Sequence, residues 1–292
     1  MESDIIVMTG ATSGLGAQAL KRLLAQPNTE VIVGARGSRA VPGASVLPLD
    51  LASLESVRSF ADAVKTHLGN TQIDVLILNA GAQFRSDQRS ADGFELTFAV
   101  NYLAHYLLAR LLLPHMASGG RLEITTSDTH AQWPIAPKKV DPQAFAHPVK
   151  NSPARAYAAS KLCDLLAARS LAALDEVQER HLTVIAYNPG LTGGTGLNGG
   201  SGSGGVGLTL MRPILRFVSF FFLHQLYVHT PEQSGDALAD LALGKITPTS
   251  GRVYASHVRG KITFPDPSKL ARSDEARDLL WRESAKMVGL HP

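Results

Sequence analysis

The sequence predicts an α/β fold, in which a single doubly wound parallel sheet of about seven strands carries helices on both faces and a lid region follows the sixth strand. Short runs rich in β-branched residues alternate with longer helical patterns along the chain. No internal repeat is visible in the 292 residues, and no linker divides them into two cores. We therefore expect one domain over residues 1–292.

The first part of the chain supplies four of the expected strands. A helix follows the first strand over residues 14–26, and a second helix over 51–68 has Ser53 as its expected N-cap. Only about ten residues separate the second and third strands, fewer than a crossover helix needs, so we expect a loop or one helical turn there. The four strands are 4–9 (DIIVMT), 30–35 (EVIVGA), 45–50 (SVLPLD) and 73–79 (IDVLILN).

The second part continues the alternation with longer helices. An apolar helix is expected over 93–116, another around Tyr157, and a closing helix over 273–290 that is capped at Ser273. The remaining strands are 121–127 (RLEITTS), 182–188 (LTVIAYN) and 251–255.

A glycine-rich stretch, residues 193–207 (GGTGLNGGSGSGGVG), interrupts this pattern directly after the sixth strand. Such a stretch has few side chains to pack and high conformational entropy. Ligands of open parallel sheets bind at the carboxyl ends of the strands. We therefore expect residues 193–230 to form a flexible lid that continues into an apolar, substrate-facing helix.

The apolar part of this region, residues 208–227 (LTLMRPILRFVSFFFLHQLY), is not expected to span a membrane. Arg212, Pro213, Arg216 and His224 interrupt it, so it falls short of the roughly 18 uninterrupted apolar residues that a span needs. The segment could instead contact a membrane surface weakly or form part of the interface of a homo-oligomer.

Composition and charge indicate a compact soluble enzyme and argue against a nucleic-acid partner, a disulfide and a signal peptide. Apolar residues make up 45% of the chain and charged residues 18%, as in a compact soluble enzyme. The net charge of +3 is spread along the chain without a Lys/Arg run, so nucleic acid is not an expected partner. Cys163 is the only cysteine, which excludes an internal disulfide and suits a reducing cytoplasm. The opening MESDIIVMTG carries acidic residues and enters a strand at once, so we expect no signal peptide and a cytoplasmic location.

The stretch TGATSGLG, residues 9–16, follows the first strand and opens the first helix. Its glycines allow the backbone to turn sharply, approach a pyrophosphate and pack the helix against the strand. The helix N-terminus adds amide donors and a favourable dipole. We therefore predict a dinucleotide site at this turn. The residues expected in it are Gly10, Thr12, Ser13, Gly14, Leu15 and Gly16.

Arginine follows the second strand, which ends in GAR. An NAD site usually has a carboxylate here that accepts hydrogen bonds from the ribose hydroxyls. This chain has Ala35 and then Arg36, with Arg39 close behind. A guanidinium suits a 2′-phosphate through its charge and its bidentate geometry, so the sequence favours NADP(H).

Three further strand ends are expected to complete the cofactor site. A carboxylate after the third strand can accept from an adenine amino group, and small residues after the fourth allow a ribose to lie against the backbone. The Pro-Gly turn after the sixth strand can wrap the nicotinamide. The residues concerned are Asp50, Leu51, Asn79, Ala80, Gly81, Pro189, Gly190, Leu191 and Thr192.

Six motifs together resemble the short-chain dehydrogenase/reductase family in order and approximate spacing. They are TGATSGLG, NAG at 79–81, VN at 100–101, TTS at 125–127, YAASK at 157–161 and NPG at 188–190. The long apolar helix, the YAASK helix and the closing LLWRESAKMVGL look most like the branch that contains retinol dehydrogenases and light-dependent protochlorophyllide reductases. The resemblance covers most of the chain and implies a Rossmann-type fold and an oxidoreductase.

Tyr157 and Lys161 are four residues apart and therefore share one face of their helix. A nearby ammonium and an oxidised nicotinamide favour the phenolate, so we expect the pKa of Tyr157 to be lowered from its ordinary value of about 10. Tyr157 could then exchange a proton with a carbonyl or alcohol oxygen. Ser127 would hold that oxygen. The resemblance also implies that Lys161 binds the nicotinamide ribose and that Asn101 orders a proton-relay water.

Two other chemistries are not supported. His130 and Asp128 follow Ser127, but the chain has no G-x-S-x-G motif to present a serine nucleophile, so a hydrolytic triad is rejected. Histidines such as His105 and His181 lack the spacing of metal ligands, and we expect no metal.

The expected substrate is a bulky lipophilic or polycyclic molecule. About thirty residues separate Ser127 from Tyr157, longer than a minimal connection. This insert carries Trp133, Pro134, Ile135 and Phe145, which we expect beside the catalytic serine together with the apolar segment of the lid. Such a pocket favours a large apolar ligand over a sugar or a short acid.

The sequence leaves two alternatives to a carbonyl reductase or alcohol dehydrogenase. One alternative is reduction of a C=C bond in a protochlorophyllide-like tetrapyrrole. It is disfavoured because the resemblance to reductases of that type fails at two positions: they have a cysteine where this chain has Leu191, and tend to have an alanine where it has Gly81. A non-catalytic dinucleotide-binding regulator is disfavoured because it would not need Tyr157, Lys161 and Ser127.

Overall fold

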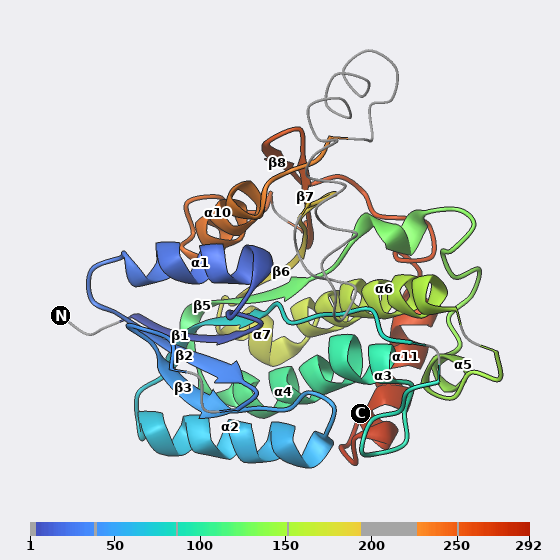
Figure 1. Ribbon diagram of the computed structural model, residues 1–292, viewed down its shortest axis with the longest axis horizontal. Coiled ribbons are helices and arrows are strands. Elements are labelled where there is room, and N and C mark those ends of the chain that lie inside the picture. The colour runs from blue at the N-terminus through green and yellow to red at the C-terminus, as the bar shows by residue number, and fades with distance from the viewer. Residues whose placement is uncertain (1–3, 38–39, 86, 151, 194–226, 250) are drawn as a thin grey trace.

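A computed structural model describes residues 4–37, 40–85, 87–150, 152–193, 227–249 and 251–292. The described strands form one sheet in the order β3-β2-β1-β4-β5-β6-β7-β8, in which all pairs are parallel except β7 with β8 (Figure 1). The strands are β1 (Asp4–Thr9), β2 (Thr29–Ala35), β3 (Ser45–Pro48), β4 (Ile73–Leu78), β5 (Met116–Thr125), β6 (Thr183–Asn188), β7 (Tyr254–Val258) and β8 (Lys261–Thr263). The prediction of a doubly wound, mainly parallel sheet is confirmed.

Helices cover both faces of this sheet (Figure 1). The described α-helices are α1 (Gly14–Leu24), α2 (Leu54–Leu68), α3 (Leu96–Phe98), α4 (Ala104–Leu112), α5 (Pro142–Ala146), α6 (Pro153–Ala172), α7 (Asp175–Glu179), α10 (Pro231–Ala242) and α11 (Asp274–Met287). Shorter or irregular turns are η1 (Ala99–Leu103), η2 (Leu113–His115) and η3 (Asp128–Ala131). The capping predictions are confirmed, since the hydroxyls of Ser53 and Ser273 accept from the backbone N–H groups of Ser56 and Ala276.

The alternation of side chains along β1 shows how the two cores form. Ile5 and Val7 face a core shared with α2, α4, α6 and α11, whereas Ile6 and Met8 face a core shared with α1 and α10. Successive side chains of a strand point to opposite faces, so a strand buried on both sides must be apolar throughout. This requirement explains why DIIVMT reads as a continuous apolar run.

The prediction of one long helix over 93–116 is wrong in detail. It begins at Leu96, passes through the π-helical turn η1 into α4, and ends in the 3₁₀ turn η2. Pro114 lies in η2, and proline cannot continue an α-helix because it lacks an N–H and clashes with the preceding turn. Met116 already belongs to β5, whose pairing with β4 shifts register between Ile73 and Val75.

The same helical run, Leu96–His115, is long and apolar enough to resemble a membrane span, but 83% of that window is buried inside the protein. It is therefore a core helix of the described structure. No other described helix meets the length and hydropathy of a span.

Four further elements differ from the prediction. The third strand ends at Pro48 rather than residue 50, and the seventh strand is Tyr254–Val258 rather than 251–255. An antiparallel eighth strand, β8, was not predicted. Helix α10 was also missed, although its sequence carries a capping box in which Thr230 and Gln233 bond each other's backbone N–H groups. The predicted lid over 193–230 falls almost entirely on residues 194–226, which lie outside the described residues.

Candidate active site

A pocket of about 1380 Å³ opens at the carboxyl ends of β1, β2, β4, β5 and β6. Strand β1 lies between β2 and β4, so the order of connection reverses at this point, which is where ligands of open α/β sheets bind. The pocket is lined by these predicted cofactor residues: Gly10, Thr12, Ser13, Gly14, Leu15, Gly16, Arg36, Asp50, Leu51, Asn79, Ala80, Gly81, Pro189, Gly190, Leu191 and Thr192. Arg39 lies outside the described residues.

The glycine turn after β1 has no room for side chains. A Cβ on Gly16 would lie 2.0 Å from the carbonyl oxygen of Gly10, and a Cβ on Gly10 would lie 2.6 Å from the backbone of Ala80. Gly10 and Gly14 also have φ angles of 70° and 56°, which favour glycine. The backbone of this turn is consequently exposed to the pocket at the start of α1, as a phosphate-binding turn requires.

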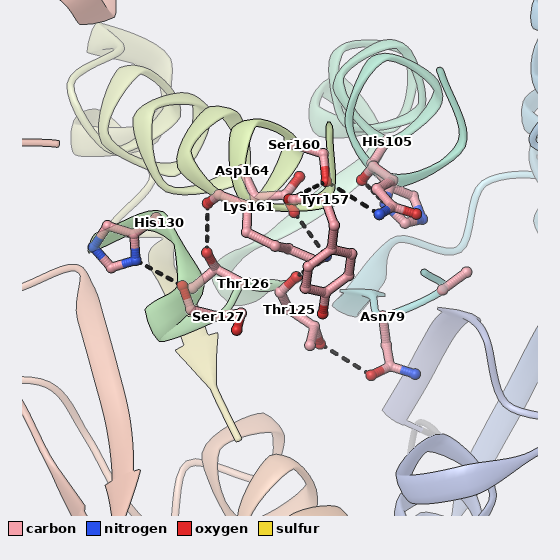
Figure 2. Close-up of polar contacts among 12 residues, drawn as sticks. Asn79, His105, Thr125, Thr126, Ser127, His130, Tyr157, Ser160, Lys161 and Asp164 are labelled. Atoms are coloured by element: carbon pink, nitrogen blue, oxygen red, sulfur yellow. Dashed lines mark hydrogen bonds and ion pairs between the residues drawn. The ribbon is translucent and has the colours of Figure 1, made fainter. Parts of the chain in front are cut away.

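Hydrogen bonds join this turn to the ends of the neighbouring strands. The hydroxyl of Thr9 accepts from the backbone N–H groups of Asn79 and Ala80 at 3.0 and 3.1 Å. The amide of Asn79 donates to the Gly10 carbonyl oxygen and accepts from the Thr125 hydroxyl, the latter bond being drawn in Figure 2. These bonds hold three strand ends in one arrangement around the pocket.

Arg36 lies at the end of β2, is exposed, and lines the pocket. Asp50, which follows the neighbouring strand β3, also lines the pocket and uses one carboxylate oxygen to accept from the backbone N–H of Ala52. The position next to Ala35 therefore presents a guanidinium and not a carboxylate to a ligand in the pocket.

Tyr157 and Lys161 both line the pocket from α6, and Ser127 lines it from the end of β5. The Lys161 Nζ lies 5.7 Å from the centroid of the Tyr157 ring and donates to the Thr125 carbonyl oxygen at 2.8 Å. The Ser127 Oγ accepts from the Thr129 backbone N–H at 3.3 Å and so caps η3. Figure 2 shows Tyr157, Lys161 and Ser127 gathered between α6 and β5.

The expected lowering of the pKa of Tyr157 combined the ammonium of Lys161 with an oxidised nicotinamide, and it stays a prediction for that complex; in the protein alone the pKa is raised. Burial raises this pKa, and although the ammonium of Lys161 and a hydrogen bond with Ser127 lower it, the pKa stays above its ordinary value. Lys161 is the stronger of the two lowering influences. Desolvation therefore outweighs the nearby charge in the protein alone.

Asn101 does not line the pocket and is fully buried. Its side-chain amide makes one bond to each backbone polar group of Ala82 and a third to the Ser160 hydroxyl at 3.1 Å. The backbone oxygen of Asn101 accepts from His105 Nδ1. The structure thus shows Asn101 holding the loop after Gly81 against α6, and its contact with a relay water stays a prediction.

The insert between β5 and α6 contributes less than predicted. Trp133 lines the pocket and is 89% exposed, but Pro134 and Ile135 are not among the lining residues. Phe145 lies on α5 and packs against Phe98, with ring centroids 6.5 Å apart, as part of the surrounding core. Phe145, which was expected beside Ser127, is therefore part of the core, because α5 packs toward α3.

Sequence reasoning missed several residues near the site. Asp164 forms an ion pair with Lys161, and its position three residues further along the same helix face was the available signal. The pocket wall formed by Tyr227, His229, Ser256, His257, Val258 and Arg259 is far from the motifs in sequence, and no local pattern indicates it. Within the described ranges, no group of three side chains could hold a metal ion.

Comparison with known proteins gives one consistent result. Residues 4–135 match the family model described as short chain dehydrogenase. The chain is 30% identical to "Short-chain dehydrogenase TIC 32 A, chloroplastic" of Brassica napus, with 97% of this chain and 88% of the relative covered. It is also 30% identical to "Protochlorophyllide reductase A, chloroplastic" of Hordeum vulgare, with 99% and 81% covered.

A solved structure extends the comparison to the fold. It is the "Crystal structure of a putative uncharacterized protein from Mycobacterium Paratuberculosis", with a TM-score of 0.71 and 24% sequence identity. The match covers 99% of this chain and 95% of that chain. The whole described architecture, including the helices on both faces, is therefore shared with a known fold.

Proposed function

Because the chain belongs to the short-chain dehydrogenase family of oxidoreductases, we propose that it transfers hydride between NADP(H) and a carbonyl or alcohol group of a bulky lipophilic substrate. The observation that carries the proposal is the convergence of the glycine turn with Ser127, Tyr157 and Lys161 on one pocket. Together they combine a dinucleotide cradle with a proton donor.

The residues around the pocket fit a bound dinucleotide. The tight packing of Gly10 and Gly16 leaves backbone N–H groups at the helix start for a pyrophosphate. Lys161 can donate to a ribose hydroxyl, and the Pro189–Gly190 turn, whose carbonyl oxygens accept from the Thr192 hydroxyl, also lines the pocket. NADP(H), when bound, supplies or accepts the hydride.

Tyr157 is assigned as the general acid and base. In the direction of carbonyl reduction its hydroxyl donates a proton to the substrate oxygen, and in alcohol oxidation its phenolate accepts one. Ser127 binds the same oxygen through its hydroxyl. Lys161 favours the phenolate by its positive charge, consistent with its lowering influence on the pKa of Tyr157.

The preference for NADP(H) is proposed from Arg36. Replacing Arg36 with leucine should weaken NADPH binding by about 1.5–3 kcal/mol, because a charged hydrogen bond to the 2′-phosphate is lost. NADH binding should change little, since it carries no such phosphate. Fluorescence titration of each nucleotide measures both effects.

Arg282→Leu is the matched control, because Arg282 is exposed on α11 and does not line the pocket. It should leave both affinities unchanged. Equal weakening of NADPH and NADH in Arg36→Leu, or a preference of the wild type for NADH, would overturn the assignment.

The size and lining of the pocket support a bulky substrate. A volume of about 1380 Å³ exceeds the roughly 300–1,000 Å³ of an ordinary small-molecule site, so room remains beside a dinucleotide. Apolar side chains that line the pocket include Phe84, Leu96, Val100, Leu191 and Val258. A panel of aldehydes, ketones and polycyclic quinones, with NADPH absorbance as readout, tests this proposal.

Reduction of a C=C bond remains the second candidate, because a relative of 30% identity is named a protochlorophyllide reductase. Leu191 and Gly81 both line the pocket at positions where the sequence departs from that type of reductase. Illumination of the protein with protochlorophyllide and NADPH distinguishes the two candidates. Binding of NADPH without turnover of any compound in either assay would instead favour a regulatory protein.

A further inference from the structure

A buried carboxylate lies directly behind the lysine of the site. The Lys161 Nζ and the Asp164 Oδ2 are 2.9 Å apart, and their side chains are only 3% and 1% exposed (Figure 2). Both residues belong to α6, where a separation of three residues places them on one face. The pair is therefore formed within the helix and removed from water.

This carboxylate helps to set the direction of the lysine. An ammonium has three N–H donors in a tetrahedral arrangement. One donates to the Thr125 carbonyl oxygen at 2.8 Å and one to Asp164 at 2.9 Å. With two directions assigned, the third is determined, and because Lys161 lines the pocket that donor is available to a ligand there.

A neutral acceptor would have satisfied the hydrogen bond without burying a second charge. The other carboxylate oxygen of Asp164, Oδ1, is buried and has no hydrogen-bond partner among the described residues. A buried carboxylate with one partner is costly compared with an asparagine, which could also accept from Lys161. The charge itself is thus the property of Asp164 that requires an explanation.

We propose that Asp164 is a positioning residue, whose negative charge keeps Lys161 protonated in its buried location and directs its remaining N–H into the cofactor pocket. The inference rests on the proposed function, because it assigns Lys161 to a bound dinucleotide. It concerns how this chain maintains the lysine and adds no step to hydride transfer.

The balance of effects on Lys161 supports this role. Burial lowers the pKa of Lys161, but the charge of Asp164 and its hydrogen bond raise it, so that the pKa lies above its ordinary value. Burial raises the pKa of Asp164 to about 6, with Lys161 opposing, so the carboxylate is ionised above that pH. Without Asp164, burial would dominate and Lys161 would lose its proton at a lower pH.

Other ionisable groups near the pair do not replace Asp164. Burial and the charge of Lys161 lower the pKa of His105 on α4 to about 3, so His105 is neutral at neutral and alkaline pH. It accepts from the Thr9 hydroxyl through Nε2 while Nδ1 donates to Asn101. The remaining titratable groups coupled to Lys161, to Asp164 or to Tyr157 are Tyr102 in η1, Cys163 and Tyr157 on α6, and Asp128 in η3.

The test is the pH dependence of NADPH binding in Asp164→Asn, measured by fluorescence titration. We expect its affinity to fall by about ten-fold between roughly neutral pH and roughly pH 9, the worth of one charge-assisted hydrogen bond, and to recover when the pH is lowered again. The wild type and Asp164→Glu, which keeps the charge, should change far less over the same range. Asp175→Asn makes the same substitution at an exposed position on α7 and should follow the wild type.

A pH profile of Asp164→Asn that coincides with the wild type, in a variant of unchanged thermal stability, overturns the proposal. A loss of affinity that is the same at every pH also overturns it, because it indicates a purely structural role. The readout does not depend on a substrate, so failure to find a reducible carbonyl would count against the proposed function and leave this inference standing.

A second measurement covers the case in which Asp164→Asn does not fold. Carbon NMR of the wild type labelled at the aspartate γ-carbons should show Asp164 ionised at neutral pH and protonated only in acid. A γ-carbon signal of a protonated Asp164 at neutral pH would overturn the proposal without any variant.

Discussion

Tyr157→Phe should reduce kcat by about 10²–10⁴-fold, the range that one general acid contributes, while leaving NADPH binding nearly intact. The substitution removes only the phenolic oxygen. The ring still lies against Lys161, whose Nζ is 5.7 Å from the ring centroid, and the backbone oxygen of Tyr157 still accepts from Ser160. Steady-state kinetics on the best carbonyl substrate, together with NADPH titration, measure the two effects separately.

Tyr106→Phe is the matched control for this experiment. The Tyr106 hydroxyl donates to the Trp281 carbonyl oxygen and accepts from Arg110, in contact with α11 and outside the pocket lining. Its loss should lower stability by about 1 kcal/mol and leave kcat unchanged. Turnover near the wild-type value in Tyr157→Phe would show that another group supplies the proton.

Gly16→Ala should have the second largest effect, with a loss of about 100-fold in catalytic efficiency with NADPH. The added Cβ would lie 2.0 Å from the Gly10 carbonyl oxygen and 2.6 Å from Asn79 Nδ2. The first contact is with backbone, so the turn itself must shift, and the N–H groups at the start of α1 shift with it. Overpacking of this kind also lowers the free energy of unfolding by about 1–3 kcal/mol, which urea denaturation measures.

Gly69→Ala separates the clash from the general effect of replacing a glycine. Gly69 ends α2 with a φ of 57°, and a Cβ there would meet nothing within 4 Å. That variant should lose roughly 1–2 kcal/mol of stability from backbone strain and retain its affinity for NADPH. If Gly16→Ala binds NADPH as tightly as Gly69→Ala, the turn after β1 is not the phosphate site.

The residues of the expected cofactor end could be placed at the pocket from the sequence, because the information is local. The turn from β1 to α1 needs glycine at positions 10 and 16 for reasons that involve neighbours within a few residues or one adjacent strand. Strand ends that follow buried runs, such as Asn79 and Asn188, meet at one edge of any parallel sheet. Order and spacing of these motifs therefore determined the fold class and the pocket residues.

Contacts between distant segments were decided only by the tertiary structure. Asn101 lies in a helix that the sequence shows as one long apolar run, yet folding places its amide against Ala82 and Ser160 and away from the pocket. Phe145 follows Ser127 in sequence but packs on Phe98. In both cases the partner is far along the chain, so no local pattern specifies it.

The pKa values of the site residues likewise could not be predicted from the sequence. The spacing of Tyr157 and Lys161 shows that they share a helix face, and together with an oxidised nicotinamide it predicts a lowered pKa of Tyr157. In the protein alone burial raises this pKa, and burial depends on how η3 and β5 pack around α6. The sequence by itself determined which groups meet at the site, whereas the packing around them decided their charge, because the cost of desolvation is a property of the whole surroundings.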